Sequence, residues 1–398
     1  MRVRCALAGR GHTARMKIQL TTQPPGLELV RDDGSRCALH PLWLRERATD
    51  AASCDPLTGQ RLYDPSDLAA DVRLTAAQEL TPGCWEVRFA DGARATLTTA
   101  AILAELPGPD AGLPVRHAWT AALATLPRVA WVPSPTDAQL RYITSLFLSR
   151  GFIIFSGVPR ASGAVLDVAR TFGLPRDTNF GLMFDVRSQP QATDLAYTSL
   201  PLDPHTDNPY RDPVPGIQLL HCLVNESTGG LSTLVDGHAV VAHLREADPA
   251  ALRILATTPV RFVYRDATTE LSHHAPLIEL DAAGELVTMR FSPRLDFVPL
   301  LPTAVLAAFY AARRTLDRLL RSEHFEIRFL LQGGDLVMFD NRRLLHGRTG
   351  FDPQQGVRHL QGCYIDMDGV HSMHRVLNRG IPASAPQSRA PAAEQLDA

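Results

Sequence analysis

Leu202-Asp203-Pro204-His205-Thr206-Asp207-Asn208-Pro209-Tyr210 is the stretch around which the rest of the chain is organised. One residue separates His205 from Asp207. On an extended strand, side chains two positions apart lie on the same face, so this imidazole and this carboxylate can reach a single ion. Many His-x-Asp pairs are surface or hydrogen-bonded pairs without a metal. A metal site therefore requires further ligands elsewhere in the chain.

His346 is the candidate third ligand. It follows a turn signal, Gly333-Gly334-Asp335, and an apolar run through Phe339 that predicts a strand. Two histidines and one carboxylate on one face of an octahedron are typical of non-haem Fe(II) sites. Arg358 comes twelve residues after His346. On a neighbouring strand, its guanidinium could pair with a dicarboxylate beside the metal.

The composition argues against several classes of function. With 40 Lys and Arg against 42 Asp and Glu, the formal net charge is -2, and no block is rich in basic residues. We therefore expect no nucleic-acid partner. No apolar run has the length of a membrane span and no secretory signal is found, which predicts a cytoplasmic protein with no membrane partner. The six cysteines show no C-x-x-C spacing, so we expect reduced thiols.

Many short apolar runs, separated by Pro and Gly turns, follow one another without a strand–helix alternation. This pattern predicts a mainly β protein with flanking helices. We predict a double-stranded β-helix (jelly roll) core in a catalytic domain over residues 136–380. Thr136 is expected to cap its first helix. Two further helices are predicted within it, from about Pro249 to Leu255 and from Ala304 to Leu320.

The segments outside this domain differ in composition. Residues 17–105 contain strand and turn signals that predict a small β-rich N-terminal domain. Residues 106–135 hold six prolines and predict a linker, although the tryptophans among them imply packing. Residues 381–398 are mostly Ala, Pro, Ser and Gln, which predicts a disordered tail. We interpret the basic residues 1–15 as an over-extended reading frame.

Five segments carry a resemblance to a known family. The segments are His205-Thr206-Asp207, Gly216-Ile217-Gln218-Leu219-Leu220-His221-Cys222-Leu223, Gly229-Gly230 through Val235-Asp236-Gly237, Phe339-Asp340-Asn341-Arg342-Arg343-Leu344-Leu345-His346, and Arg358-His359-Leu360-Gln361-Gly362-Cys363-Tyr364. In this order they resemble the gamma-butyrobetaine dioxygenase branch of the taurine dioxygenase-like superfamily. Its members are Fe(II)- and 2-oxoglutarate-dependent oxygenases. The match spans most of residues 150 to 376.

The resemblance implies that His205, Asp207 and His346 hold Fe(II) at the catalytic centre. It also implies 2-oxoglutarate and dioxygen as cosubstrates, with Arg358 binding the far carboxylate of 2-oxoglutarate. Thr233 is a second candidate for that pocket, and an ordinary strand threonine is the alternative. Hydroxylation of an unactivated C–H bond is then the expected reaction. Two other classes stay open, a non-catalytic cupin-like binding protein and a zinc hydrolase.

In the resembled family, the N-terminal domain holds a structural zinc ion through clustered cysteines and a histidine. The matching segment opens with Leu42-Trp43-Leu44-Arg45, but only Cys54 follows it here as a candidate thiolate. One thiolate cannot build a tetrahedral zinc site. We therefore predict that this domain keeps its fold without zinc. Family members commonly pair, which implies a homodimer.

The resembled enzymes grip a trimethylammonium group in a cage of aromatic rings, which quaternary ammonium ions favour. The matching positions in this chain are Phe180, Phe184, Tyr197 and Tyr364, all aromatic. On a local helix, Phe180 and Phe184 would face one way. Asp194 is a candidate carboxylate beside the cation, with a strand cap as the alternative. The implied substrate is a small quaternary ammonium compound.

The site for the anionic end of the substrate departs from the family. Where the gamma-butyrobetaine enzymes have Asn-containing segments, this chain has Arg290-Phe291-Ser292-Pro293-Arg294. Ser292 and Arg294 are candidate substrate-binding residues, because an arginine beside a serine suits a doubly charged oxyanion better than a carboxylate. This favours 2-(trimethylammonio)ethylphosphonate, with gamma-butyrobetaine, hydroxylated to carnitine, as the alternative substrate. The alternative expectation is that Arg290 and Arg294 face solvent, as is usual for an arginine at the end of a strand.

Overall fold

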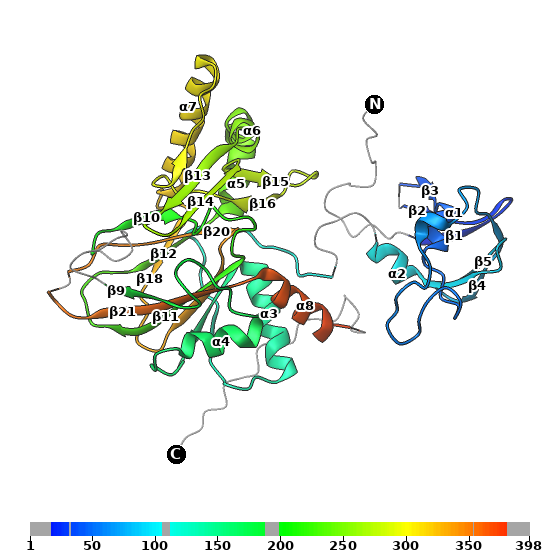
Figure 1. Ribbon diagram of the computed structural model, residues 1–398, viewed down its shortest axis with the longest axis horizontal. Coiled ribbons are helices and arrows are strands. Elements are labelled where there is room, and N and C mark those ends of the chain that lie inside the picture. The colour runs from blue at the N-terminus through cyan, green and yellow to red at the C-terminus, as the bar shows by residue number, and fades with distance from the viewer. Residues whose placement is uncertain (1–16, 32, 106–111, 188–198, 353, 380–398) are drawn as a thin grey trace. The chain divides into compact units, whose positions relative to one another are not determined.

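A computed structural model describes residues 17–31, 33–105, 112–187, 199–352 and 354–379. The chain divides into two compact units, with the boundary between Gly112 and Leu113. Figure 1 labels most of the helices and strands of both units. The expected tail and the basic N-terminal segment lie outside the described residues. In the described part of the chain, no helix combines the length and apolarity needed to cross a membrane.

The N-terminal unit is rich in β structure, as its alternating sequence predicts. Two three-stranded antiparallel sheets form it. Its elements are β1 (Lys17–Thr22), β2 (Pro25–Val30), β3 (Arg36–Ala38), α1 (Pro41–Arg45), η1 (Pro65–Asp67), β4 (Leu74–Thr81), β5 (Cys84–Phe89), β6 (Arg94–Thr98) and α2 (Thr99–Ala104). The inward positions of β5 and β6, such as Val87 and Ala95, are fully buried. They share one apolar core with Leu27 and Leu44.

Two larger sheets organise the second unit. The six-stranded sheet has the order β7-β8-β19-β11-β21-β9, and the four-stranded sheet has the order β10-β20-β12-β18. Only the β7–β8 pair is parallel among these described strands. The strands are β7 (Arg128–Ala130), β8 (Phe152–Ser156), β9 (Phe184–Arg187), β10 (Leu202–His205), β11 (Ile217–Asn225), β12 (Ser232–Asp236), β18 (Glu326–Phe329), β19 (Leu336–Asp340), β20 (Leu344–Arg348) and β21 (Arg358–Ile365).

The two sheets face each other across an apolar core. Phe152, Phe339 and Leu360 come from the six-stranded sheet, and Leu234 and Leu344 come from the four-stranded sheet. All five side chains are at most 2% exposed. Burying such side chains stabilises the fold by roughly 1.5–3 kcal/mol each. The antiparallel pairing agrees with a sequence that shows no regular strand–helix alternation.

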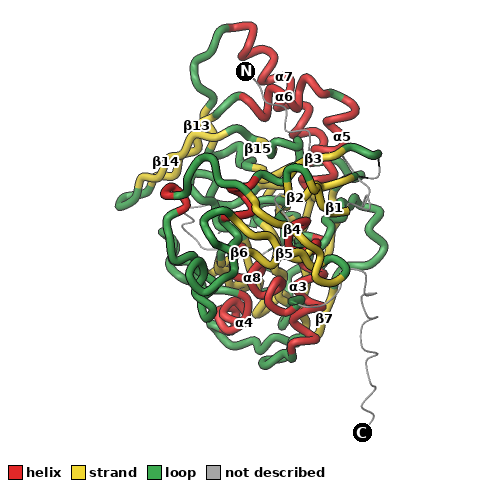
Figure 2. The backbone as a smooth tube through the Cα atoms, turned by 90° about the vertical axis from the view of Figure 1, so that its right-hand side faces the viewer, coloured by secondary structure: helices red, strands yellow, loops and turns green. Residues whose placement is uncertain are grey.

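Three helices cover the outer face of the six-stranded sheet. They are α3 (Asp137–Arg150), α4 (Ala164–Phe172) and α8 (Met367–Leu377), and Phe147, Val168 and Val370 are their buried contacts in one apolar cluster. Thr136 forms the predicted capping box with Gln139 at the start of α3. In Figures 1 and 2, these helices lie at one end of the second unit.

Shorter strands and three more helices gather at the other end of this unit (Figure 2). They are α5 (Gly237–Ala247), α6 (Pro249–Thr257), β13 (Val260–Arg265), β14 (Glu270–Ala275), β15 (Ile278–Leu280), β16 (Leu286–Met289), β17 (Asp296–Phe297) and α7 (Thr303–Leu320). Asp248 caps α6 by accepting from the Ala251 N–H, with Pro249 at the first helical position. The sequence predicted α6 and α7 but not α5.

The expected linker over residues 106–135 belongs to the second unit from Leu113 onward. Trp119 is only 4% exposed, and its Nε1 donates to the Arg150 carbonyl at 2.8 Å. Further along, β7 adds a parallel strand to β8. The proline content pointed to a linker, but the buried tryptophan and the strand pairing anchor this segment to the larger fold.

Candidate metal and cosubstrate site

Two paired strands and the turn after one of them bring the three predicted metal ligands together. His205 ends β10 and lies opposite His346 on β20, in the register of the antiparallel pair. Asp207 follows two residues later. The ligand atoms of the three side chains all lie within 4.8 Å of one another. Asp207 Oδ1 is 3.5 Å from His205 Nε2, and Asp207 Oδ2 is 3.9 Å from His346 Nε2.

Hydrogen bonds orient these ligands. His205 Nδ1 lies 2.9 Å from the Asp203 carbonyl, so it acts as the donor and leaves Nε2 for the metal. Asp207 Oδ2 accepts from Gln218 Nε2 at 2.9 Å and from the Tyr364 hydroxyl at 2.8 Å. Asn341 holds the backbone of Asp207 on both sides, accepting from its N–H and donating to its carbonyl, each at 2.9 Å. The carboxylate is therefore fixed before any ion binds.

The charge states suit a divalent cation. Burial alone would raise the pKa of Asp207, but His346, His205 and the Tyr364 hydroxyl hold it well below its usual range. Burial, together with His205 and Arg294, lowers the pKa of His346 to about 3, although the Asp207 charge acts in the opposite direction. At neutral pH the site thus presents an ionised carboxylate and a neutral His346, the forms that bind metal. Two imidazoles and one carboxylate fit Fe(II).

Arg358 and Thr233 are buried with unsatisfied polar atoms. Arg358 is 7% exposed and Thr233 is 4% exposed. Arg358 Nε and Thr233 Oγ1 have no hydrogen-bond partner among the described residues. Burial lowers the pKa of Arg358, whose guanidinium lies 5.4 Å from the centre of the Phe351 ring. Buried polar groups without partners are costly, so each of these two atoms is suited to a ligand that accepts a hydrogen bond.

The sequence predicted that Arg358 lies on a strand next to that of His346, and this prediction is wrong. Arg358 begins β21 in the six-stranded sheet, whereas His346 lies on β20 in the four-stranded sheet. The arginine therefore comes from the facing sheet and not from a neighbouring strand. Thr233 is on the metal side, because it pairs with Gly347 next to His346.

Aromatic rings form a chain beside Asp207. The Phe180 and Phe184 ring centroids are 6.2 Å apart, and Phe184 stacks on Tyr364 at 5.3 Å with an interplanar angle of 29°. Phe180 also contacts Tyr264 at 5.6 Å, and Tyr264 contacts Tyr210 at 5.2 Å. The sequence did not single out Tyr264 or Tyr210.

Phe180 and Phe184 come together in a different way from the one that the sequence predicted. Phe180 and Phe184 do not lie on a helix, because a tight turn between Thr178 and Gly181 precedes β9, which begins at Phe184. The rings meet through this turn. Tyr197 and Asp194 lie outside the described residues.

The segment expected to bind the anionic end lies against the metal-binding stretch. Thr206 donates its N–H to the Phe291 carbonyl at 2.9 Å and accepts from the Phe291 N–H through Oγ1 at 3.0 Å. Ser292 is 1% exposed, and its Oγ has no partner among the described residues. Arg294 is exposed, yet close enough to lower the pKa of His346. The expectation that Arg290 faces solvent is wrong, because this residue is 5% exposed and pairs with Glu279.

Gln218 and Asn341 are site residues that the sequence did not single out. Gln218 is 1% exposed on β11, between apolar neighbours, and Asn341 is fully buried directly after β19. A polar residue inside an apolar strand is the signal that would have identified Gln218. Asn341 gives no such signal, because turn asparagines are common.

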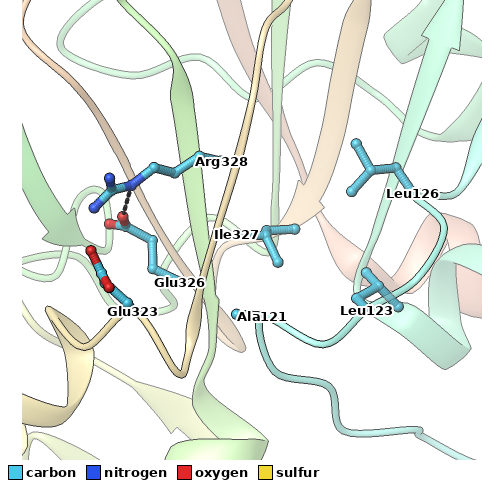
Figure 3. A pocket seen from close by; sticks show the side chains of 7 residues that line it. All are labelled: Ala121, Leu123, Leu126, Glu323, Glu326, Ile327 and Arg328. Atoms are coloured by element: carbon cyan, nitrogen blue, oxygen red, sulfur yellow. Dashed lines mark hydrogen bonds and ion pairs between the residues drawn. The ribbon is translucent and has the colours of Figure 1, made fainter.

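A surface pocket of about 370 Å³ contains none of these residues. It is lined by Ala121, Leu123, Leu126, Glu323, Glu326, Ile327 and Arg328. Figure 3 shows the hydrogen bond from Arg328 to Glu326 on one side of this pocket, and Leu123 and Leu126 on the other side. Arg328 and Glu326 partner each other, and none of the lining residues has a buried side-chain atom without a hydrogen-bond partner among the described residues.

Comparison with known proteins adds independent information. The family model "Taurine catabolism dioxygenase TauD, TfdA family" matches residues 119–364. Gamma-butyrobetaine dioxygenase of Pseudomonas sp. (strain AK-1) is 35% identical over 365 residues, covering 89% of this chain and 94% of that protein. The human gamma-butyrobetaine dioxygenase is 34% identical, covering 58% and 61%. Trimethyllysine dioxygenase of Gallus gallus is 29% identical, covering 94% and 91%.

Proposed function

The chain belongs to the TauD, TfdA family and is a 2-oxoglutarate-dependent dioxygenase, and we propose that it hydroxylates a small trimethylammonium compound with an anionic end. The single observation that carries this proposal is the convergence of His205, Asp207 and His346 beside stacked aromatic rings. We also infer that the two facing sheets of the second unit form a double-stranded β-helix, which their shared apolar core supports.

Each predicted site residue takes a role under this proposal. His205 Nε2, an Asp207 oxygen and His346 Nε2 hold Fe(II). Arg358 pairs with the far carboxylate of 2-oxoglutarate, and Thr233 donates to the same group; their unpartnered atoms support this assignment. Bound iron and 2-oxoglutarate supply the oxidising power for C–H hydroxylation. The protein contributes ligation, a buried site and orientation of the substrate.

The aromatic rings select the cationic end. A trimethylammonium group has no N–H to donate, so it gains most from ring faces that replace its water. Phe180, Phe184 and Tyr364 provide such rings within contact of one another. The family resemblance adds Tyr197 and Asp194 to this cage. Tyr364 also touches Asp207, which brings the cation close to the metal.

Two substrates differ at the anionic end. Gamma-butyrobetaine is the first candidate, because relatives at 35% and 34% identity carry that name. 2-(Trimethylammonio)ethylphosphonate is the second, because Arg294 adds a positive charge near His346 and Ser292 adds an unpartnered hydroxyl. Ser292 and Arg294 bind the anion in either case. The dioxygenase relatives favour an enzyme over a cupin-like binding protein or a zinc hydrolase.

The deciding experiment compares product formation from both substrates, with Fe(II) and 2-oxoglutarate present. We expect a higher kcat/KM for gamma-butyrobetaine; a higher value for the phosphonate would reverse the ranking. No hydroxylation of either compound would refute the proposed substrate class. Arg294→Ala should weaken the phosphonate reaction more than the carboxylate reaction, with the exposed Arg314→Ala on α7 as the matched control. Equal losses would remove the argument that Arg294 favours the phosphonate.

The oligomeric state, the cellular location and the partners of the protein stay predictions. We propose a homodimer that acts in the cytoplasm without nucleic-acid or membrane partners. Sedimentation of the purified protein at several concentrations tests the dimer. A single species of about 43.5 kDa at all concentrations would contradict it.

A further inference from the structure

Tyr364 takes part in both halves of the site. Its hydroxyl donates to Asp207 Oδ2 at 2.8 Å. Its ring stacks on Phe184, with centroids 5.3 Å apart. The residue is 3% exposed on β21, so neither contact is a loose surface contact. One side chain therefore joins a metal ligand to the aromatic rings.

The strand register explains why two donors reach one oxygen. Gln218 on β11 and Tyr364 on β21 are direct partners across the antiparallel pair, so their side chains lie on the same face. Gln218 Nε2 donates to the same Asp207 Oδ2 at 2.9 Å. Asp207 Oδ1 accepts from neither and lies 3.5 Å from His205 Nε2. The two donors thus occupy one carboxylate oxygen and leave the other for the metal.

Backbone geometry also favours the stack. Gly362 precedes Tyr364 by two positions and pairs with Phe184 in the β21–β9 register. A Cβ at position 362 would collide with the Phe184 ring, so glycine there allows the ring to lie over the strand and reach Tyr364.

We propose that Tyr364 is a positioning residue that turns the Asp207 carboxylate toward the metal, in addition to forming a wall of the cation cage. The cage half rests on the proposed function, whereas the metal half rests on the Asp207 contacts alone. Partners that orient metal ligands typically change metal affinity by about 10–100-fold when they are removed. The hydroxyl should therefore affect the Fe(II) affinity, whereas the ring should affect the KM for the organic substrate.

Tyr364→Phe tests this separation, because it removes the hydroxyl and keeps the ring. Fe(II) affinity is measured without oxygen or organic substrate, by competition with a chromogenic chelator. We expect about tenfold weaker Fe(II) binding, with the KM for gamma-butyrobetaine changed less than about twofold. Phe184→Leu is the matched control and should show the opposite pattern, a raised KM with unchanged Fe(II) affinity. Unchanged Fe(II) affinity in folded Tyr364→Phe would overturn the proposal.

Gln218→Met removes the other donor and keeps the test decisive if Tyr364→Phe does not fold, as judged by circular dichroism. It should also weaken Fe(II) binding, and the double variant should differ from the sum of the single effects, because both donors share one oxygen. Strictly additive effects would contradict a shared role. The iron titration contains no organic substrate, so a wrong substrate assignment would leave its outcome intact.

Discussion

The Asp207 carboxylate in the metal region (His205, Asp207 and His346) and the polar groups of the cosubstrate region (Arg358 and Thr233) differ in how the protein holds them. Asp207 is held through both its side chain and its backbone by Gln218, Tyr364 and Asn341. Arg358 Nε and Thr233 Oγ1 have no partner within the described part of the chain. Arg358 and Thr233 are buried, whereas Asp207 and His346 are only partly buried, so exposure to water does not explain why the more buried groups lack partners.

The difference indicates which part of the site is complete before ligands bind. An unsatisfied buried polar group costs about 1–3 kcal/mol, so a fold keeps one only where something else will satisfy it. The metal region is preorganised by protein hydrogen bonds, which fix the carboxylate without an ion. Under the proposed function, 2-oxoglutarate completes the cosubstrate region. Substitutions at four positions in these regions test this contrast, and a fifth, at His221, provides a reference outside them.

The largest effect is expected from removing a metal ligand. Asp207→Ala and His205→Ala should each reduce 2-oxoglutarate turnover by more than the roughly 10–100-fold that follows loss of a ligand's hydrogen-bond partner. The measurement is succinate formation with added Fe(II). Residual turnover above a tenth of the wild-type rate would show that the metal lies elsewhere.

Arg358→Met should weaken the binding of 2-oxoglutarate without destabilising the fold. Loss of a buried charged partner costs about 2–5 kcal/mol, so we expect the KM for 2-oxoglutarate to rise at least about 30-fold. Because Arg358 forms no ion pair among the described residues, the ligand-free variant should unfold at an equal or higher temperature. Fe(II) affinity should not change. A lower melting temperature with unchanged KM would show that Arg358 is structural.

Low pH should destabilise the fold by protonating buried histidines. His221 lies outside both regions and is the reference for this effect. Burial lowers the pKa of His221 to about 4, partly offset by the backbone of Val158. The unfolded chain binds this proton near the ordinary pKa of about 6.5, so stability is lost as pH falls from about 6.5 to about 4. His221→Leu should remove up to about 3 kcal/mol of that loss. Urea unfolding at pH 7 and pH 4.5 measures it, and identical pH dependence in both proteins would contradict the assignment.

Thr233→Val should give the smallest effect. It removes one hydroxyl at similar volume, and a hydrogen bond of about 1 kcal/mol corresponds to roughly a fivefold rise in the KM for 2-oxoglutarate. Because the hydroxyl is unpartnered in the ligand-free protein, the melting temperature should not fall. Strand threonines outside the site offer controls, such as the solvent-facing Thr96→Val on β6. An unchanged KM would favour the reading of Thr233 as an ordinary strand residue.

Local sequence rules predicted the parts of this molecule that depend on near neighbours. The two-residue spacing of His205 and Asp207, the capping box at Thr136 and the Asp248-Pro249 helix start were all visible in the chain, because each depends on residues a few positions apart. The same rules failed for Phe180 and Phe184, where helical spacing was a coincidence. A turn brings those rings together instead.

Long-range contacts were beyond such rules. That Arg358 comes from the sheet opposite His346, and that Gln218 and Tyr364 share one oxygen of Asp207, depends on strand order and register. Those properties arise from how two sheets bury a common apolar core, which involves the whole second unit at once. The sequence by itself thus predicted the three side chains of the candidate metal site. Only the tertiary structure decided which of them meet, because register and sheet packing are collective properties that no local spacing encodes.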